Sequence, residues 1–477
     1  MKKSVIFVRV VGGLSLFAIA FGFAGCLSIK KALQEQETLV TTGDYEGAYQ
    51  KAAEFAVEDG ADQAFWSEEA GVLALMTGKS KEAVAHLNAA DDGFNDVARR
   101  RYGSSAMDTA VALAGNDCTL PYAPDGVDRV FVNVYKALAY GMQQKPESMR
   151  VELNRARQRQ IEWFGVCAGD IAEKGASDLS KDDQKAVAEV TAGQVKGPKL
   201  AAGVAGMVSQ EGAGAARHFV QLKGFGNAYA AHLAGITRWC AGDSSRNDLA
   251  MAAALAPQAA AVVSDARKVA AGGVPTGRVW VYVEDGLGPR REGRPFTLPL
   301  PSIAAHGRGV TTVSFDVPKL VQREWASGGG WSVTGGGELA LLADVDALMT
   351  DQFDRAWAGI IARQVARTLI RVAISEGGQA ALRNTTGGQV TSLLWSATVS
   401  LYDVATNEAD LRCADLLPKG VWVGALERPE SGRIELKARN GVTVPVQLPA
   451  ESQKNAVVWV RLPAAGARPV VAVIELN

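Results

Sequence analysis

Histidine is scarce in this chain of 477 residues, and the scarcity limits its metal chemistry. The only histidines are His86, His218, His232 and His306, and none is three or four residues from another or beside a cysteine. A zinc site needs three or four converging nitrogen, sulfur or oxygen ligands. The sequence therefore predicts no metal site.

Common catalytic motifs are also missing. The chain has no GxSxG nucleophile elbow, no HExxH helix and no Walker loop. Glycine clusters at 328–330 and 335–337 do not have the spacing of a phosphate-binding loop. We therefore expect no cofactor and a function other than catalysis.

Neither sign of charge predominates. The chain has 50 Lys and Arg against 51 Asp and Glu, a formal net charge of −1, and loss of the three basic residues within 1–25 would leave −4. Such a balance favours neither nucleic acid nor an anionic membrane surface as a partner. After the N-terminal segment, no apolar stretch is long and charge-free enough to span a bilayer.

The N-terminal segment has the features of a lipoprotein signal. Basic residues up to Arg9 precede an apolar run over 10–23, and small residues lead to Cys26. The run is shorter than the roughly 20 residues of a membrane-spanning helix and contains three glycines. We expect cleavage after residues 1–25 and acylation of Cys26. Leu27 in the next position favours the periplasmic face of an outer membrane.

Four cysteines follow Cys26, namely Cys118, Cys167, Cys240 and Cys413. In an oxidising periplasm they allow two disulfides in any of three pairings. Their wide spacing matches neither a zinc pattern nor a CxxC redox motif. Buried free thiols are the alternative.

Alanine-rich helical patterns fill the chain from 26 to 270. Gly43 and Gly78 mark turns 35 residues apart, close to the period of about 34 residues in tetratricopeptide repeats. Further helical hairpins are expected over 130–163 and 227–256, with a variable connection at 169–226 between them. We predict a tetratricopeptide-like domain, and an irregular helical bundle is the alternative.

Composition changes at 270–275, and strand patterns follow. We predict a β-rich α+β domain over 276–477, antiparallel and sandwich-like, with helices near 346–375 and 389–405. Its expected strands are 279–283, 311–317, 339–343, 421–426, 433–437, 442–448, 456–462 and 470–476.

Two groups of charged residues are candidate partner-binding sites. Glu284 and Asp285 end an apolar strand pattern, where they form either a polar binding lip or an ordinary hairpin turn. Adjacent strand positions face opposite sides of a sheet, which argues against a glycosidase pair. Arg363, Arg367 and Arg371 form a single stripe on an expected helix, which faces either a partner or solvent.

Three stretches resemble a known group of proteins. They are 135–139 with 150–160, then 279–289, and 407–412 followed by 416–418. The chain is similar there to a largely uncharacterised family of bacterial lipoproteins with tetratricopeptide-like repeats. It departs from the family pattern at 413–414 and 224–228. Members often accompany envelope lipoproteins that resemble the curli secretion channel or penicillin-binding-protein activators, which implies a role in envelope assembly and supplies no catalytic residues.

Together these features predict a non-enzymatic lipoprotein of the cell envelope. Its helical hairpins are expected to form a concave surface that binds other envelope lipoproteins or secretion components. Two alternatives are an envelope glycan-processing hydrolase and a structural subunit of a secretion channel. The hydrolase would need acids such as Glu284, Asp285, Asp344 and Asp346 to converge in one pocket.

Overall fold

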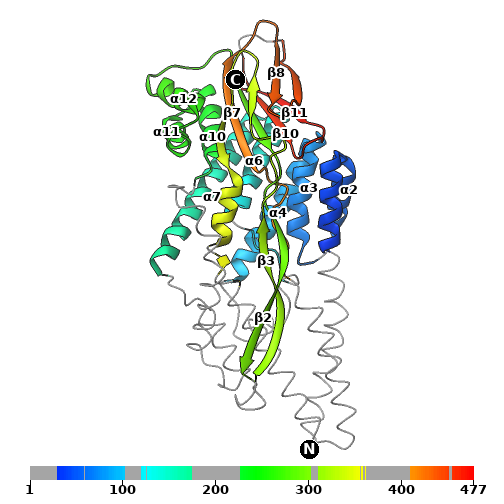
Figure 1. Ribbon diagram of the computed structural model, residues 1–477. Coiled ribbons are helices and arrows are strands. Elements are labelled where there is room, and N and C mark those ends of the chain that lie inside the picture. Colours follow the sequence, from blue (N-terminus) through cyan, green and yellow to red (C-terminus); the bar gives the residue numbers. More distant parts are fainter. Residues whose placement is uncertain are drawn as a thin grey trace, which may run out of the picture.

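The computed structural model describes residues 29–58, 60–101, 120–124, 126–173, 226–301, 310–354, 356–357, 360, 409–450 and 454–476. Helices occupy the N-terminal half, and antiparallel-rich sheets occupy the C-terminal region (Figure 1). The protein is therefore a mixed α and β protein, as predicted. Among the described helices, none has the length and apolar character needed to cross a membrane.

The helices follow one another in pairs along the chain. The first described helix covers 29–42. The others before the first strand are α2 (Tyr45–Val57), α3 (Gln63–Met76), α4 (Ser80–Arg101), α6 (Gly126–Met142), α7 (Pro146–Glu173), α10 (Ala228–Cys240), α11 (Arg246–Leu255) and α12 (Ala260–Ala270). The pairs α6–α7 and α10–α11 lie where the sequence predicts helical hairpins.

Four turns between consecutive helices share one hydrogen-bond pattern. Gly43, Gly78, Gln144 and Gly242 each follow a helix with a positive φ, of 84°, 78°, 55° and 76°. In each turn, the backbone N–H of the residue after the positive-φ residue donates to the carbonyl five residues earlier, at 2.8–2.9 Å. These bonds run from Asp44 to Leu39, Lys79 to Ala74, Lys145 to Tyr140 and Asp243 to Arg238. This Schellman arrangement satisfies the last carbonyls of a helix and favours glycine, which has no Cβ to oppose a positive φ.

The strands form three sheets. The main sheet has the order β11-β10-β1-β7-β6, a smaller one has the order β5-β4-β8-β9, and β2 pairs with β3 alone. Their bounds are β1 (Arg278–Asp285), β2 (Arg290–Pro301), β3 (Val310–Val321), β4 (Trp331–Val333), β5 (Gly337–Glu338), β6 (Ala340–Asp344), β7 (Gly420–Glu427), β8 (Arg433–Ala438), β9 (Thr443–Gln447), β10 (Asn455–Leu462) and β11 (Val470–Leu476). One pairing, β1 with β10, is parallel.

Strand β1 lies at the centre of the main sheet and is buried on both faces. Val279, Val281 and Val283 belong to a core shared with the small sheet. Trp280 and Tyr282 belong to a core shared with the helices. The alternation follows the two-residue period of a strand. Because both faces are covered, the main sheet separates two hydrophobic cores.

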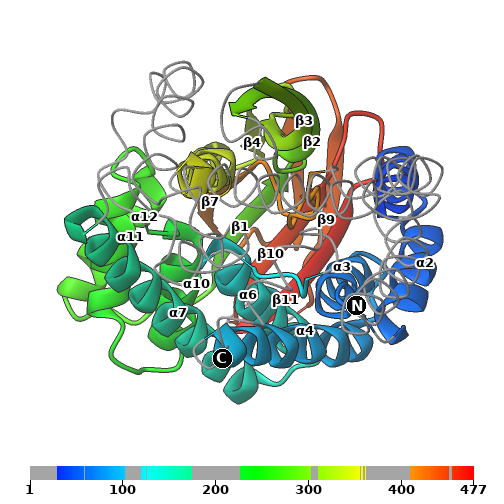
Figure 2. The same cartoon turned by 90° about the horizontal axis from the view of Figure 1, so that it is seen from below.

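The helices curve around one face of the main sheet (Figure 2). The inner helices α3, α6 and α10 have almost every residue buried, whereas the outer helices α2 and α11 bury only a few. At Gly141 of α6, an added Cβ would lie 2.8 Å from Ile474 of β11. The surface toward which the helices curve is therefore packed against the chain's own sheet.

Strands β2 and β3 form a two-stranded ribbon that extends away from the main sheet (Figure 1). The sequence pattern indicates β3 but not β2, because β2 is interrupted by prolines. Arg290 at its base contacts Glu37 of the first helix at 3.0 Å.

The domain boundary predicted at 270–276 falls between α12 and β1, and the helix-side core continues across it. A helix begins at residue 345 and is described continuously to 354. The rest of the helix predicted at 346–375, apart from 356–357 and 360, lies outside the described residues. The helix predicted at 389–405 and most of the connection at 169–226 also lie outside them.

Candidate functional site

Glu284 points into the helix-side core and is fully buried. Its carboxylate accepts hydrogen bonds from Tyr135 of α6 at 3.1 Å, Tyr229 of α10 at 3.2 Å and Trp459 of β10 at 2.8 Å. Arg461 lies 3.8 Å away. Burial raises the pKa of Glu284, and Arg461 and the three donors oppose that rise. The carboxylate thus connects two helices to the sheet and offers no atom to a partner.

Asp285 lies on the opposite face of the sheet, as alternation requires. It accepts hydrogen bonds from the Ser327 backbone N–H at 3.0 Å and from the indoles of Trp331 at 3.2 Å and Trp422 at 3.0 Å. Burial raises its pKa against these bonds. Asp285 is therefore an anchor of the small sheet, and neither acid is accessible to a partner in this structure.

The other acids considered for hydrolysis are also engaged. Asp344 accepts from the Ala347 backbone N–H at 3.0 Å and so caps the helix that begins at 345. Asp346 is 3% exposed and forms an ion pair with Lys419. Burial raises the pKa of Asp346 to about 6, although Lys419 opposes the shift. These contacts stabilise local structure, and they do not form an acid–base pair in a cleft.

A buried chain of polar side chains was not apparent in the sequence. The Tyr282 hydroxyl lies 2.7 Å from Nδ1 of His232, and Nε2 of that ring lies 3.2 Å from Asp265. Trp280 donates to the same carboxylate at 2.7 Å, and Arg278 pairs with it at 2.8 Å. The order resembles a catalytic relay, but Tyr282, His232 and Asp265 are each 0% exposed. We interpret the chain as a core network that joins α10, α12 and β1.

Within the described residues, no group of three or more His, Cys, Asp and Glu side chains has the arrangement of a metal site. Cys240 and Cys413 are free, buried thiols. Burial raises the pKa of Cys240 to about 12 and that of Cys413 further. Cys26, Cys118 and the side chain of Cys167 lie outside the described residues, as do Arg363, Arg367 and Arg371.

A polar groove lies between the outer helices α4 and α7, with α6 as its floor. Its volume is about 580 Å³. The α4 wall carries Asn88, Asp91, Asp92 and Asn95, and the α7 wall carries Arg155, Gln158, Arg159 and Glu162. Both sets have the spacing i, i+3, i+4 and i+7, which places four side chains on one face of a helix. The groove therefore has a mainly acidic wall opposite a mainly basic one.

Ion pairs hold the groove in shape. Lys136 of α6 is 1% exposed and lies 3.7 Å from Asp91 and 3.2 Å from Glu152. Arg159 bridges the walls to Asp91 at 3.1 Å. Asp92 on one wall is exposed. Arg155 on the other wall is also exposed, and it pairs with Glu152 at 2.5 Å. Such a groove can bind a polar segment that carries charges of both signs.

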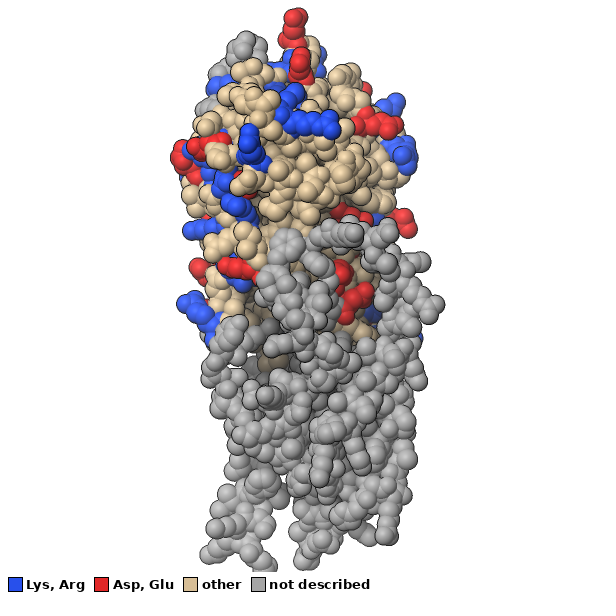
Figure 3. Space-filling view, turned by 90° about the vertical axis from the view of Figure 1, so that its left-hand side faces the viewer, with Lys and Arg blue, Asp and Glu red and all other residues tan. Residues whose placement is uncertain are grey.

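On the face that includes α11 and α12, the described residues carry charges of both signs. Figure 3 shows Lys and Arg beside Asp and Glu around an uncharged centre. The described part of this face therefore has no basic patch of the kind that binds phosphate backbones.

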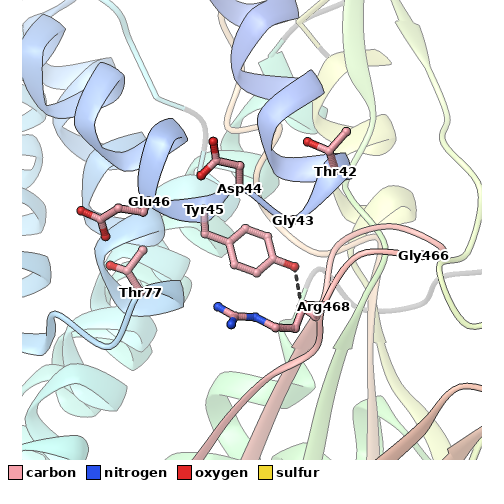
Figure 4. A pocket seen from close by; sticks show the side chains of 8 residues that line it. All are labelled: Thr42, Gly43, Asp44, Tyr45, Glu46, Thr77, Gly466 and Arg468. Atoms are coloured by element: carbon pink, nitrogen blue, oxygen red, sulfur yellow. Dashed lines mark hydrogen bonds between the residues drawn. The ribbon is translucent and has the colours of Figure 1, made fainter.

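A second hollow of about 470 Å³ lies where the N-terminal helices meet the β10–β11 turn. Figure 4 shows Tyr45 between Asp44 and the Arg468 side chain. The Tyr45 hydroxyl donates to the Arg468 carbonyl at 2.5 Å. Gly43 lies beside Arg468, and its φ of 84° favours glycine, whereas a Cβ there would meet the Arg468 nitrogen at an ordinary contact distance of 3.4 Å. The hollow is a junction between the first and last parts of the described chain.

No family model matches this chain, and neither the curated proteins nor the solved structures include a significant match.

Proposed function

We propose that this protein is a lipid-anchored scaffold of the cell envelope, attached through Cys26 to the periplasmic face of an outer membrane. Its partners are other envelope lipoproteins or components of a secretion system. The observation that carries this role is the α4–α7 groove, which presents ordered charges on rigid helices. The signal sequence and the resemblance to repeat-containing lipoproteins agree with it.

We also infer that the helical pairs are tetratricopeptide-like and that the two stacked sheets form a sandwich-like C-terminal domain. Two features support the first part: the four Schellman turns and the alternation of inner and outer helices. The shared core of the main and small sheets supports the second.

The partner surface is placed on the outside of the helical layer, and not on the predicted concave side. The inner helices are covered by the main sheet, and Glu284 joins two of them to it. A partner segment would have to displace this sheet to reach them. The groove between α4 and α7 needs no such rearrangement.

The charges of the groove define the partner segment. Asp92 favours a basic side chain on one edge of the segment, and Arg155 favours an acidic one on the other. Exposed charges contribute mainly to specificity and to the rate of association.

Crosslinking and affinity purification of the intact lipoprotein from its native envelope, followed by mass spectrometry, tests this role. The double variant Asp92→Lys with Arg155→Glu reverses one charge on each wall. Its matched control, Glu54→Lys with Lys268→Glu, makes the same changes on exposed positions of α2 and α12. Cys26→Ala tests the requirement for the anchor.

We expect wild type and control to recover the same envelope proteins, and the groove variant to recover about tenfold less of at least one of them. Loss of all partners with Cys26→Ala supports anchoring as a condition of assembly. Recovery of the protein alone from wild-type envelopes contradicts the scaffold role. Equal recovery by the groove variant would move the partner surface elsewhere.

A further inference from the structure

A small cavity lies where four segments of the chain meet. Its volume is about 20 Å³, room for a single particle close to the size of a water molecule. The first turn of α6, the middle of α7, the residue before α10 and the helix that begins at 345 surround it. It is separate from the α4–α7 groove and from the hollow at Tyr45.

Three amide side chains line this cavity and have unpaired donors. Gln160, Asn227 and Gln352 are 3%, 4% and 3% exposed. The side-chain nitrogen of each is buried and has no hydrogen-bond partner in the described part of the chain. A buried N–H group without a partner is costly, so three around one cavity call for an acceptor.

Backbone contacts fix the orientation of two of these amides. The Asn227 oxygen accepts from the N–H groups of Tyr229 at 3.1 Å and Ala230 at 3.2 Å, as the N-cap of α10. The Gln352 oxygen accepts from the N–H of Val127 at 3.3 Å. Because each oxygen is in use, the NH₂ group must be the end that is left unpaired.

The surrounding backbone also favours negative charge. Helix α6 begins at Gly126 and α10 begins at Ala228, so the N-terminal ends of two helices lie at the cavity. Partial positive charge at such ends attracts anions. Asp351 also lines the cavity, and it takes part in an interaction of its own.

We propose that this cavity binds a single small monovalent anion of the halide class, for which chloride is the probe. A halide accepts several N–H groups at once and has no proton that needs an acceptor. The bound ion joins α6, α7, α10 and the helix from 345, and it stabilises the folded protein when chloride is present.

Thermal unfolding of the full chain tests the site at constant ionic strength, with sodium chloride exchanged for sodium gluconate, whose anion is too large for the cavity. Wild type should show a saturable rise in Tm of roughly 2 °C or more with chloride. Asn227→Asp and Gln352→Glu keep the acceptor oxygen that the backbone uses and replace the donor with a carboxylate oxygen. Both should lose the rise. Asn154→Asp, which adds the same charge on the exposed face of α7, should keep it.

Chloride NMR on the folded wild type provides a second readout that does not depend on the variants' stability. Exchange with the site should broaden the chloride resonance of wild type and Asn154→Asp, and not that of Asn227→Asp. An equal chloride effect on every protein would be a general salt effect and would overturn the proposal. Absence of any chloride-specific shift or broadening in wild type would overturn it as well and leave water as the occupant.

Discussion

The Tyr45 hydroxyl donates a 2.5 Å hydrogen bond to the backbone carbonyl of Arg468, a residue 423 positions later in the chain. Tyr45 is only 2% exposed and begins α2, while Arg468 lies in the turn between the last two strands. Burial raises the pKa of Tyr45, against the charges of Arg461 and Arg468. One phenol thus closes the helical layer onto the C-terminal hairpin.

Replacement Tyr45→Phe should lower the free energy of unfolding by about 1 kcal/mol, because it removes the donor and leaves the Arg468 carbonyl unpaired. Urea unfolding followed by circular dichroism measures the change. Tyr49→Phe is the matched control, since no hydrogen bond of its hydroxyl is seen in the described residues. Equal effects of the two variants would show that the contact contributes nothing specific.

Removal of the Glu284 carboxylate should lower the free energy of unfolding far more. Glu284→Ala leaves the two phenols and the Trp459 indole without their buried acceptor and Arg461 without its counter-ion, so we expect a loss of roughly 3–5 kcal/mol. Glu435→Ala, at an exposed position of β8, should change stability by less than about 0.5 kcal/mol. Denaturant unfolding distinguishes this anchoring role from partner binding. A Glu284→Ala protein of normal stability that lost its partners would support the binding lip.

Glu68 in α3 is 1% exposed, and neither carboxylate oxygen has a partner in the described region. Burial raises its pKa well above 4.5, and the charge of Asp128 raises it further. In the folded protein the Glu68 carboxyl therefore stays protonated at pH values at which the same carboxyl in the unfolded chain has already lost its proton. Stability should fall as pH rises from about 4.5 through the raised pKa, by about 1.4 kcal/mol per pH unit for this one group.

The variant Glu68→Gln keeps the shape and cannot ionise, so its stability should exceed that of wild type increasingly as pH rises through this window. Unfolding midpoints measured at several pH values give the difference. Glu82→Gln, at an exposed position in the first turn of α4, is the matched control. Parallel profiles for wild type and Glu68→Gln would show that Glu68 does not titrate as inferred.

Prolines protect one edge of the β2–β3 ribbon. Pro295, Pro299 and Pro301 pair with Asp316, Thr312 and Val310, and Pro318 pairs with Gly293, so all four lie in the same alternate set of pairs. Proline has no backbone N–H and so cannot donate to the partner strand. The pairs that contain the prolines must therefore be those whose backbone N–H groups point away from the partner strand. The outer edge of β2 therefore lacks three of the donors that another strand would need.

Replacement of Pro295, Pro299 and Pro301 by threonine restores those donors and should promote association between chains. Size-exclusion chromatography with light scattering should show a shift to species of at least twice the mass. Pro429→Thr, in the turn after β7, adds an N–H donor outside any strand, and its mass should equal that of wild type. A triple variant with unchanged mass would argue against edge protection.

Local sequence was enough to predict the helical turns and most strands. Gly43, Gly78 and Gly242 indicate turns because a positive φ after a helix favours glycine. In β8 and β9, apolar residues alternate with polar ones, and burial alternates in the same way. These features depend on contacts within a few residues, so a short window of sequence contains the information.

The roles of Glu284 and Asp285 could not be predicted in this way. Acids at the end of an apolar strand, next to Gly286, are typical of an exposed turn. Their donors come from Tyr135, Trp331, Trp459 and other residues that are far away in sequence. The α4–α7 groove also forms only when α6 brings its two walls together.

The sequence by itself determined the turns between helices and the position of most strands, because capping, alternation and turn chemistry act locally. Its N-terminal pattern up to Cys26 predicts a lipoprotein signal, on which the proposed anchoring rests. Tertiary structure alone decided that β1 pairs in parallel with β10 and that the main sheet fills the curve of the helices. The physical reason is that burial and long-range hydrogen bonding depend on residues brought together by the whole fold. Whether a charged side chain is buried or exposed therefore depends on the tertiary structure.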